Sequence, residues 1–380
     1  MHQRSKQTVC PVRLRYGTKS VHRRRFAANL VQAIAISQES LLRGMATQTR
    51  FLRRQSTDVV GRRWLIFYHE SMRETAIKVK TEMGVSGVLS ELTWNRFNDG
   101  FPNLQIDKDD AARLETFHGT CLIVSFHTPE VIFEQLALVY ALPKMRARNF
   151  RIILPWFSTG TMERVEKIGQ IATANSLARM LSCCPMGPGG PATVVIYDIH
   201  ALQEQFYFAD TVLVELKSGV WLLKEKLEQL RKECPEEEIA IVFPDDGAHK
   251  RFKAKFHGLP SIVCAKVREG EKRIVTVKEG EPTGRHCVII DDLVQSGGTL
   301  LECAKPLNDL GAAKVSCFVT HGVFPKESWK KFVGNGLIHK FWITDSIPTT
   351  CAAIADKAPF EVLSLAPLIA RYLQGIAEED

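Results

Sequence analysis

The sequence predicts an α/β protein made of two tandem domains, each a mostly parallel sheet with helices on both faces. Short apolar runs alternate with longer amphipathic stretches along the chain, a pattern typical of parallel strands that are buried on both faces. The length of 380 residues suits about two domains of roughly 100–200 residues each. Hydrophobic residues make up 45% of the chain and charged residues 24%, which is ordinary for a globular protein.

The first 60 residues differ from the rest in charge. They contain ten Arg, two Lys and only two acids, Glu39 and Asp58, for a net charge of +10, whereas residues 61–380 carry −2. The basic, Ser-rich composition and the stretch Arg23–Met45 predict a mitochondrial or plastid transit peptide. The alternative is an unfolded extension, with translation starting at Met45. Because the rest is nearly neutral, we expect no nucleic-acid partner, and without a long apolar run we expect no membrane span.

The first half of the remaining chain alternates strand-like and helix-like segments. Apolar runs predict strands at 64–69, 121–126, 151–157 and 193–200. Helical spacing predicts a helix that follows the first strand through Thr81, and further helices at 129–142 and 165–184. These segments predict a first domain at 62–213.

The second half repeats the alternation. Strands are expected at 239–246, 261–267, 286–292 and 314–323, and helices at 247–256 and 299–312. They predict a second domain at 214–355, followed by a C-terminal segment at 356–380.

The segment 287–299, CVIIDDLVQSGGT, carries the strongest functional signal. Asp291 and Asp292 end a buried strand at the edge where open α/β sheets bind ligands. The two glycines that follow allow a tight turn, so that backbone N–H groups and the N-terminus of the next helix can face an anion. The loop suits a phosphate monoester, and the two carboxylates suit vicinal hydroxyls or a hydrated Mg²⁺. A plain turn with solvated acids is the alternative.

This segment resembles the phosphoribosyl pyrophosphate loop of type I phosphoribosyltransferases and of phosphoribosyl pyrophosphate synthetases. Further motifs resemble the second family, ribose-phosphate diphosphokinase, in its plant-type class II form. They are RFNDGFPNL (96–104), PEVIFEQ (129–135), VVIYDIHALQEQFYFAD (194–210), VFPDDGAHKRF (242–252), CAKVREGEKRIV (264–275) and THGVFPK (320–326). The resemblance runs from about residue 64 to the C-terminus. It implies two type I phosphoribosyltransferase-like domains and transfer of the diphosphoryl group of ATP, or of another nucleoside triphosphate, to ribose 5-phosphate.

The resemblance also implies roles for residues on the ribose 5-phosphate side. Asp291 and Asp292 match the acids that hold the ribose hydroxyls. The phosphate loop of the family matches Gln295, Ser296, Gly297, Gly298 and Thr299.

On the ATP side the resemblance implies a Mg²⁺ cofactor. Asp198, His200 and Asp245 match the metal and Mg²⁺-ATP contacts. Lys266 and Arg268 match the catalytic basic pair on a mobile flap, where two cations would stabilise developing charge. The neighbouring Lys250 and Arg251 are interpreted as a solvated helix face.

Phe97 and Asp99 match family positions that bind the adenine of ATP. The chain departs from the commoner pattern at Gln295, where many members have Asp, and at 157–164, where FSTGTMER replaces an Arg-Gln pair. Both departures resemble the class II pattern.

Two alternative functions use the same phosphate loop. A non-catalytic regulatory subunit would be expected to lack flap or metal residues, and all of them are present. A phosphoribosyltransferase needs only one such domain, and the tandem domain disfavours it. The family also implies a homo-oligomer.

Overall fold

The computed structural model describes residues 62–269 and 272–377, and for residues 266–269 and 272–274 it describes the backbone alone. The predicted transit peptide lies outside the described residues. Two β-sheets and one separate hairpin form the β-structure of the described part. Both sheets belong to one compact unit.

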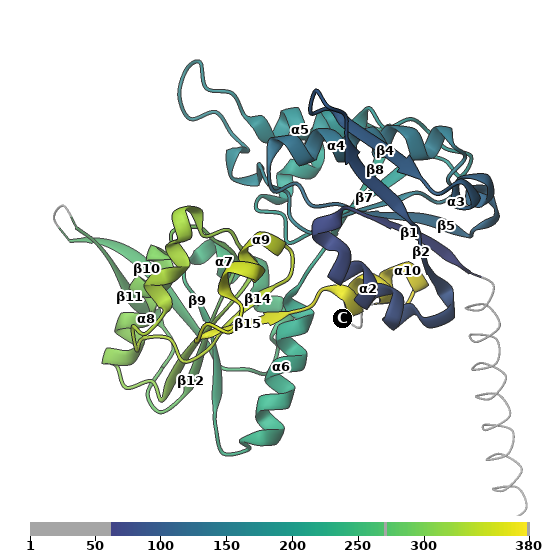
Figure 1. Ribbon diagram of the computed structural model, residues 1–380. Helices are drawn as coiled ribbons and strands as arrows, with labels where there is room; N and C mark the ends of the chain where they lie inside the picture. Colours follow the sequence, from purple (N-terminus) through teal and green to yellow (C-terminus); the bar gives the residue numbers. More distant parts are fainter. Residues whose placement is uncertain (1–61, 270–271, 378–380) are drawn as a thin grey trace, which may run out of the picture. The chain divides into compact units, whose positions relative to one another are not determined.

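The first sheet is entirely parallel, with six strands in the order β2-β1-β5-β6-β7-β8 (Figure 1). The fifth and seventh strands of the chain, β5 and β7, are buried along their whole length, as expected where helices cover both faces. The strands are β1 (Trp64–Tyr68), β2 (Gly87–Leu89), β5 (Gly119–Ile123), β6 (Arg151–Leu154), β7 (Ala192–Tyr197) and β8 (Val212–Lys217).

Successive residues of these strands point to opposite faces. Leu65 and Phe67 join a buried cluster with α4 and α5, whereas Trp64 and Ile66 join a second cluster with α2 and α10. The last helix of the chain therefore packs on the first sheet. The helices are α2 (Arg73–Met83), α3 (Lys108–Arg113), α4 (Pro129–Lys144), α5 (Thr173–Ser182) and α10 (Ala366–Gln374).

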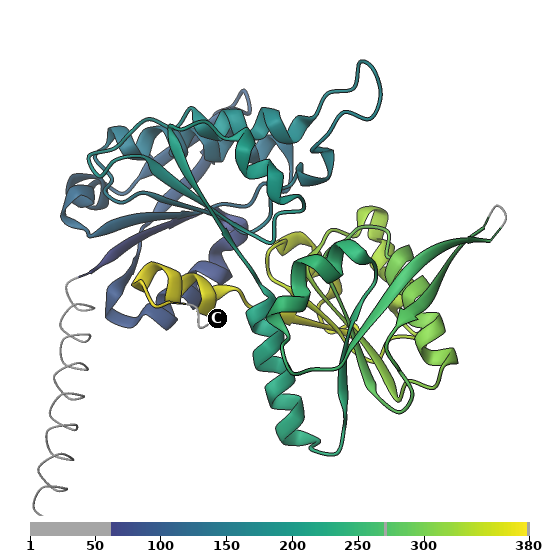
Figure 2. The same cartoon turned by 180° about the vertical axis from the view of Figure 1, so that it is seen from behind.

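The second sheet has seven strands in the order β11-β10-β9-β12-β13-β14-β15, and only the β10–β11 pair is antiparallel. Its strands have the green to yellow colours in Figure 2. One face packs on α8 and the other on α6 and α7. The strands are β9 (Ile239–Phe243), β10 (Ser261–Glu269), β11 (Lys272–Glu279), β12 (His286–Val294), β13 (Lys314–Gly322), β14 (Phe341–Thr344) and β15 (Phe360–Leu363). The helices are α6 (Val220–Glu233), α7 (Asp246–Phe252), α8 (Gly298–Asp309) and α9 (Pro348–Ile354).

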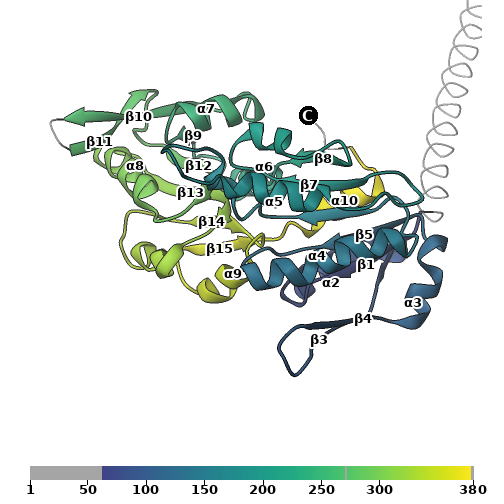
Figure 3. The ribbon, with the colours of Figure 1, turned by 90° about the horizontal axis from the view of Figure 1, so that it is seen from above.

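Shorter elements complete the described fold. The antiparallel hairpin of β3 (Leu92–Arg96) and β4 (Pro102–Ile106) extends away from the first sheet (Figure 3). The 3₁₀ segments are η1 (Glu70–Met72), η2 (Gly84–Ser86), η3 (Leu114–Thr116), η4 (Gly160–Met162), η5 (Leu202–Tyr207), η6 (Lys253–Lys255) and η7 (Pro325–Phe332). In the described residues every helix is too short or too polar to span a bilayer.

The helix expected at 165–184 forms only from Thr173 to Ser182. Gly169 has a φ of +85°, outside the helical region, and the side chain of Gln170 accepts hydrogen bonds from the backbone N–H groups of Glu166 and Lys167. This side-chain turn competes with the helix. The prediction was wrong for residues 165–172 and 183–184. It failed at 165–172 because helical spacing does not reveal such local competition. The predicted α/β class with mostly parallel sheets is confirmed.

Candidate functional site

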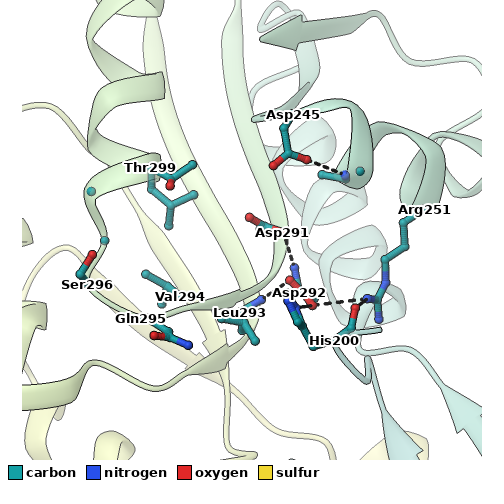
Figure 4. Close-up of a pocket in the computed structure, with 15 residues that line it drawn as sticks. His200, Asp245, Arg251, Asp291, Asp292, Leu293, Val294, Gln295, Ser296 and Thr299 are labelled. Carbon is teal, nitrogen blue, oxygen red and sulfur yellow. Dashed lines mark hydrogen bonds and ion pairs between the residues drawn. The ribbon is translucent and has the colours of Figure 1, made fainter. Parts of the chain in front are cut away.

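The predicted phosphate loop lines a pocket of about 410 Å³ at the carboxyl ends of β9 and β12. Parallel strands of an open sheet end here in loops, which is where such sheets bind ligands. Figure 4 shows the Asp245 and Asp291 carboxylates on the side of the pocket that faces the loop carrying Ser296 and Thr299. His200, which lies far away in the sequence after β7, also lines the pocket.

The backbone of the loop is fixed by one glycine and by contacts with η7. Gly297 has a φ of +77°, and a Cβ there would lie 2.4 Å from Cε2 of Phe332. The Gln295 carbonyl accepts from Ser328 Oγ at 2.8 Å, and the Ser296 carbonyl accepts from Lys331 Nζ at 3.1 Å. With these carbonyls held by η7, the N-terminus of α8 lines the pocket and offers backbone donors to an anion.

The two acids of the doublet have different surroundings. Asp292 Oδ2 lies 2.8 Å from His200 Nδ1 and 3.4 Å from Arg251 Nη1, while its Oδ1 accepts from the Leu293 N–H at 2.9 Å. Asp291 accepts only from the Asp292 N–H, at 2.9 Å, among the described residues. Asp292 is therefore tied to protein partners, and Asp291 has acceptor capacity left for a ligand.

The pKa directions of the doublet follow from these contacts. Burial and the adjacent charge of Asp292 raise the pKa of Asp291 well above its ordinary value, and Asp245 adds to the rise. Burial also acts to raise the pKa of Asp292, but the hydrogen bond from His200 and the charge of Arg251 outweigh it, so this pKa is lowered. The bond to Asp292 in turn raises the pKa of His200.

The Asp198 carboxylate is held by three protein donors. Its φ of +36° is unusual for a non-glycine residue, and its carboxylate accepts from Ser218 Oγ at 2.8 Å, the Gly219 N–H at 2.7 Å and Thr320 Oγ1 at 2.5 Å. In the described part of the chain, no three His, Cys, Asp or Glu side chains group as a metal site. Asp198, His200 and Asp245, which the sequence predicts as metal or Mg²⁺-ATP contacts, do not form such a group by themselves.

Asp245 follows β9, and it both caps α7 and lines the pocket. Its Oδ1 caps α7 by accepting from the Ala248 N–H at 2.9 Å, and the residue lines the pocket. Capping fixes the carboxylate at the mouth of the pocket.

The remaining predicted residues lie outside the pocket lining. Phe97 and Asp99 form the turn of the β3–β4 hairpin, where Phe97 is 55% exposed and Asp99 Oδ1 accepts from the Phe101 N–H at 3.1 Å. Lys266 and Arg268 lie on β10, and their side chains are outside the described ones.

Arg251 is a pocket residue that the sequence interpretation missed. Its guanidinium donates to the His200 carbonyl at 3.0 Å and lies 3.4 Å from Asp292 and 3.6 Å from Asp198. The neighbouring Lys250 is exposed, as expected. The sequence could have indicated this position. Ala248 and Arg251 are three residues apart on the helix that Asp245 caps, so they lie on the same face of it.

Glu204 is a second unpredicted residue beside the pocket. It lies on η5, is fully buried, and accepts from the Ala201 N–H through Oε1 at 3.3 Å. Its Oε2 has no hydrogen-bond partner among the described residues. Burial raises the pKa of Glu204 to about 7.

The chain is similar to one protein-family model and to several plant proteins. A family model described as the phosphoribosyl synthetase-associated domain matches residues 240–378. The chain is 52% identical over 317 residues to the chloroplastic ribose-phosphate pyrophosphokinase 3 of Oryza sativa subsp. japonica, covering 82% of this chain and 76% of the rice protein. It is 52% identical over 293 residues to the mitochondrial ribose-phosphate pyrophosphokinase 3 of Spinacia oleracea, covering 75% and 70%.

A third plant relative and a solved structure agree. The chain is 51% identical over 315 residues to ribose-phosphate pyrophosphokinase 4 of Arabidopsis thaliana, covering 81% of this chain and 91% of that protein. The crystal structure of phosphoribosylpyrophosphate synthetase from Mycobacterium smegmatis superposes with a TM-score of 0.66 at 22% identity, over 83% of this chain and 99% of that chain. The structural likeness establishes the fold.

Proposed function

Because this chain belongs to the ribose-phosphate pyrophosphokinase family, we propose that its pocket binds ribose 5-phosphate and carries out diphosphoryl transfer there. The enzyme transfers the diphosphoryl group of ATP to the C1 hydroxyl of ribose 5-phosphate, giving phosphoribosyl diphosphate and AMP, a precursor for nucleotide biosynthesis. The observation that carries the assignment of the pocket is the anchored loop 295–299 at the start of α8, beside the partly satisfied carboxylate of Asp291.

The 5-phosphate of the sugar is assigned to the loop. Backbone N–H groups at the helix start and the hydroxyls of Ser296 and Thr299 can donate to its oxygens. Asp291 is assigned to a ribose hydroxyl, because it retains free acceptor capacity at the pocket. Gln295 is uncharged, so it adds no repulsion to the phosphate where an acid would.

Mg²⁺ fits the acidic side of the pocket. Asp245 and Asp292 both contribute to the raised pKa of Asp291, so three carboxylates repel one another here, and a divalent cation would relieve that repulsion. Mg²⁺ commonly takes one or two protein carboxylates and completes its shell with water and substrate phosphates. Asp245 and Asp291 would supply the carboxylates. The ion would neutralise charge on the transferring phosphates.

His200 suits a contact with the metal-bound nucleotide. Its Nδ1 is engaged by Asp292, which orients the ring and leaves Nε2 for a ligand. Arg251 acts as a positioning residue, because it holds the His200 carbonyl and the Asp292 carboxylate together. Asp198 is assigned a supporting role in place of the predicted metal contact, since its oxygens already accept three hydrogen bonds.

Lys266 and Arg268 are proposed as the catalytic cations. They lie two residues apart on β10. Positive charge brought to the transferring group stabilises the charge that develops there, and one such contact is worth about 10²–10³ in rate. Phe97 and Asp99 are proposed to bind the adenine ring of the donor nucleotide.

Assembly and location complete the proposal. The β3–β4 turn that carries Phe97 is not part of the pocket lining. We therefore propose a homo-oligomer in which the turn of another copy reaches this pocket, and light scattering tests it.

Two relatives carry chloroplastic and mitochondrial labels, which supports an organelle address. A fluorescent fusion of residues 1–60 tests it.

The activity is tested by AMP release from purified full-length protein with Mg²⁺, ribose 5-phosphate and ATP or GTP. AMP should form only when ribose 5-phosphate is present. In Lys266→Ala, turnover should fall at least 100-fold while ribose 5-phosphate binding stays within about threefold. Release of pyrophosphate from phosphoribosyl diphosphate and a base, without ATP, would assign a transferase instead.

A further inference from the structure

The segment η7 contacts the phosphate loop from outside the pocket. Ser328 Oγ donates to the Gln295 carbonyl at 2.8 Å, and Lys331 Nζ donates to the Ser296 carbonyl at 3.1 Å. Neither Ser328 nor Lys331 lines the pocket, whereas Gln295 and Ser296 both do (Figure 4). Two consecutive peptide units of the loop therefore turn their carbonyl oxygens toward η7.

These two contacts also fix the N–H groups of the same peptide units. In a planar trans peptide the C=O and N–H bonds point in opposite directions. The Gln295 carbonyl shares its peptide unit with the Ser296 N–H, and the Ser296 carbonyl shares its unit with the Gly297 N–H. Among the described residues, neither of these N–H groups donates to another protein atom. Both donors are therefore left for a ligand, on the side of the loop opposite to η7.

The loop needs such restraints because its glycines permit other backbone conformations. Gly297 and Gly298 follow Ser296 directly, and a peptide unit next to a glycine can rotate at little steric cost. Rotation of the unit between Ser296 and Gly297 would replace the N–H with a carbonyl oxygen, which repels an anion. The hydrogen bond from Lys331 opposes this rotation.

Segment η7 is anchored in the core of the second sheet. Trp329 and Phe332 directly follow Ser328 and Lys331, and both are buried in that core. A closely packed anchor beside each donor fixes the backbone from which the donor extends. Ser328 itself is half-buried and Lys331 is exposed, so either side chain can be replaced without opening a cavity in the core.

We propose that Ser328 and Lys331 are positioning residues for ribose 5-phosphate. They hold the Gln295 and Ser296 carbonyls away from the substrate, so that the Ser296 and Gly297 N–H groups meet the oxygens of the 5-phosphate. Lys331 also brings a positive charge beside the loop, which favours a bound phosphate. This inference rests on the proposed function, because the ligand is the sugar phosphate of that reaction.

The test measures ribose 5-phosphate binding to the full-length protein by isothermal titration calorimetry, without ATP. Ser328→Ala/Lys331→Met removes both donors, so the dissociation constant should rise at least about tenfold. Ser328→Thr/Lys331→Arg keeps a donor at each position and should stay within about threefold of the wild type. If the first variant does not fold by circular dichroism, the single variants Ser328→Ala and Lys331→Met replace it, each with a rise of at least about threefold.

Lys330→Met is the matched control for the charge that is lost. It removes a neighbouring exposed lysine of the same segment, whose ammonium pairs with Glu327 at 2.7 Å. This variant should bind ribose 5-phosphate as the wild type does.

Steady-state kinetics distinguish positioning from a general structural effect. In Ser328→Ala/Lys331→Met the KM for ribose 5-phosphate should rise at least about tenfold, while kcat and the KM for ATP stay within about threefold. The reason is that the loop binds the 5-phosphate, at the opposite end of the sugar from the reacting C1 hydroxyl. A fall in kcat with an unchanged KM for ribose 5-phosphate would overturn the positioning role.

The binding results separate this inference from the proposed function. If the wild type binds ribose 5-phosphate and the folded Ser328→Ala/Lys331→Met variant binds it equally well, the positioning role is overturned and the pocket assignment stands. Equal weakening in Lys330→Met would also overturn it, because no specific role would remain for the contacts with the loop. A wild type that does not bind ribose 5-phosphate would overturn the proposed function and this inference together.

Discussion

Single side chains at this pocket are set by partners that lie far away in the sequence. Asp292 is clamped by His200 and Arg251, whereas its neighbour Asp291 faces the pocket with spare acceptor capacity. The doublet therefore divides into one positioning acid and one acid that can meet a ligand. This division depends on Arg251, which also holds the His200 carbonyl.

Replacing Arg251 tests the clamp. Arg251→Ala leaves the carboxylates of Asp292 and Asp198 without their cation, so we expect kcat/KM to fall by about 10- to 100-fold and the free energy of unfolding by about 1–3 kcal/mol. Steady-state kinetics and urea denaturation measure the two effects. Lys250→Ala, which removes an exposed neighbouring charge on the same helix, is the control and should change neither by much. Equal losses of kcat/KM and of unfolding free energy in the two variants would contradict a specific role for the contacts of Arg251.

The pKa of Glu204 gives a test of pH dependence. Its pKa in the folded protein is raised from 4.5 to about 7, so the folded state binds more protons than the unfolded state between these values. Stability is therefore lost as pH rises from about 4.5 to 7. Glu204→Gln lacks this titration and should be more stable than the wild type by about 1–3 kcal/mol at pH 8, and by much less at pH 4.5. Chemical denaturation measures this difference in unfolding free energy. A difference that does not vary with pH would contradict the raised pKa of Glu204.

At the scale of elements, the phosphate loop depends on one backbone conformation. Gly297 combines a φ of +77° with a close approach of the Phe332 ring, so a side chain there is both strained and crowded. Gly298 lacks both constraints, since a Cβ there would meet nothing closer than Ser296 Oγ at 3.8 Å.

The two glycines form a matched pair for mutation. Gly297→Ala should lower the free energy of unfolding by about 2–4 kcal/mol, from the left-handed conformation and the displaced Phe332. Gly298→Ala should cost less than about 1 kcal/mol. Thermal or urea unfolding of both variants compares them directly. If Gly298→Ala proves the more damaging of the two, the described loop geometry is wrong.

The part of this site that is contiguous in the chain could be predicted from the sequence. The strand, loop and helix start at 287–299 are contiguous, so apolar runs and glycines were enough to predict them. The separate environments of Asp291 and Asp292 were not predictable, because Arg251 and His200 come from other elements. The helix expected to begin at 165 begins at Thr173, because the turn made by Gln170 is a side-chain effect that periodicity does not register.

At the scale of the whole molecule, Asp198 connects the two sheets. It follows β7 of the first sheet and accepts from Thr320 Oγ1 on β13 of the second. His321, the next residue, contacts the Tyr197 carbonyl at 3.0 Å and Ser346 Oγ at 2.9 Å. The contacts of Asp198 with Thr320 and of His321 with Tyr197 were not visible in the sequence, since the residues they join are more than 100 positions apart.

Removing the Thr320 hydroxyl tests the connection between the sheets. Thr320→Val keeps the side-chain shape and leaves the buried Asp198 oxygen with one donor fewer, so the free energy of unfolding should fall by about 1–2 kcal/mol. Thr81→Val is the control, because its hydroxyl bonds only within α2 and is exposed. Chemical denaturation measures both. A loss no larger than in the control would mean that the hydrogen bond to Asp198 adds little stability.

The transfer of an intact diphosphoryl group from ATP to ribose 5-phosphate is tested most directly by following a label on the β-phosphate of ATP. With Mg²⁺ and ribose 5-phosphate, the label should appear in phosphoribosyl diphosphate, with unlabelled AMP formed in equal amount. Without ribose 5-phosphate, the label should stay in ATP. Label recovered in ADP, or AMP formed without the sugar phosphate, would contradict the account.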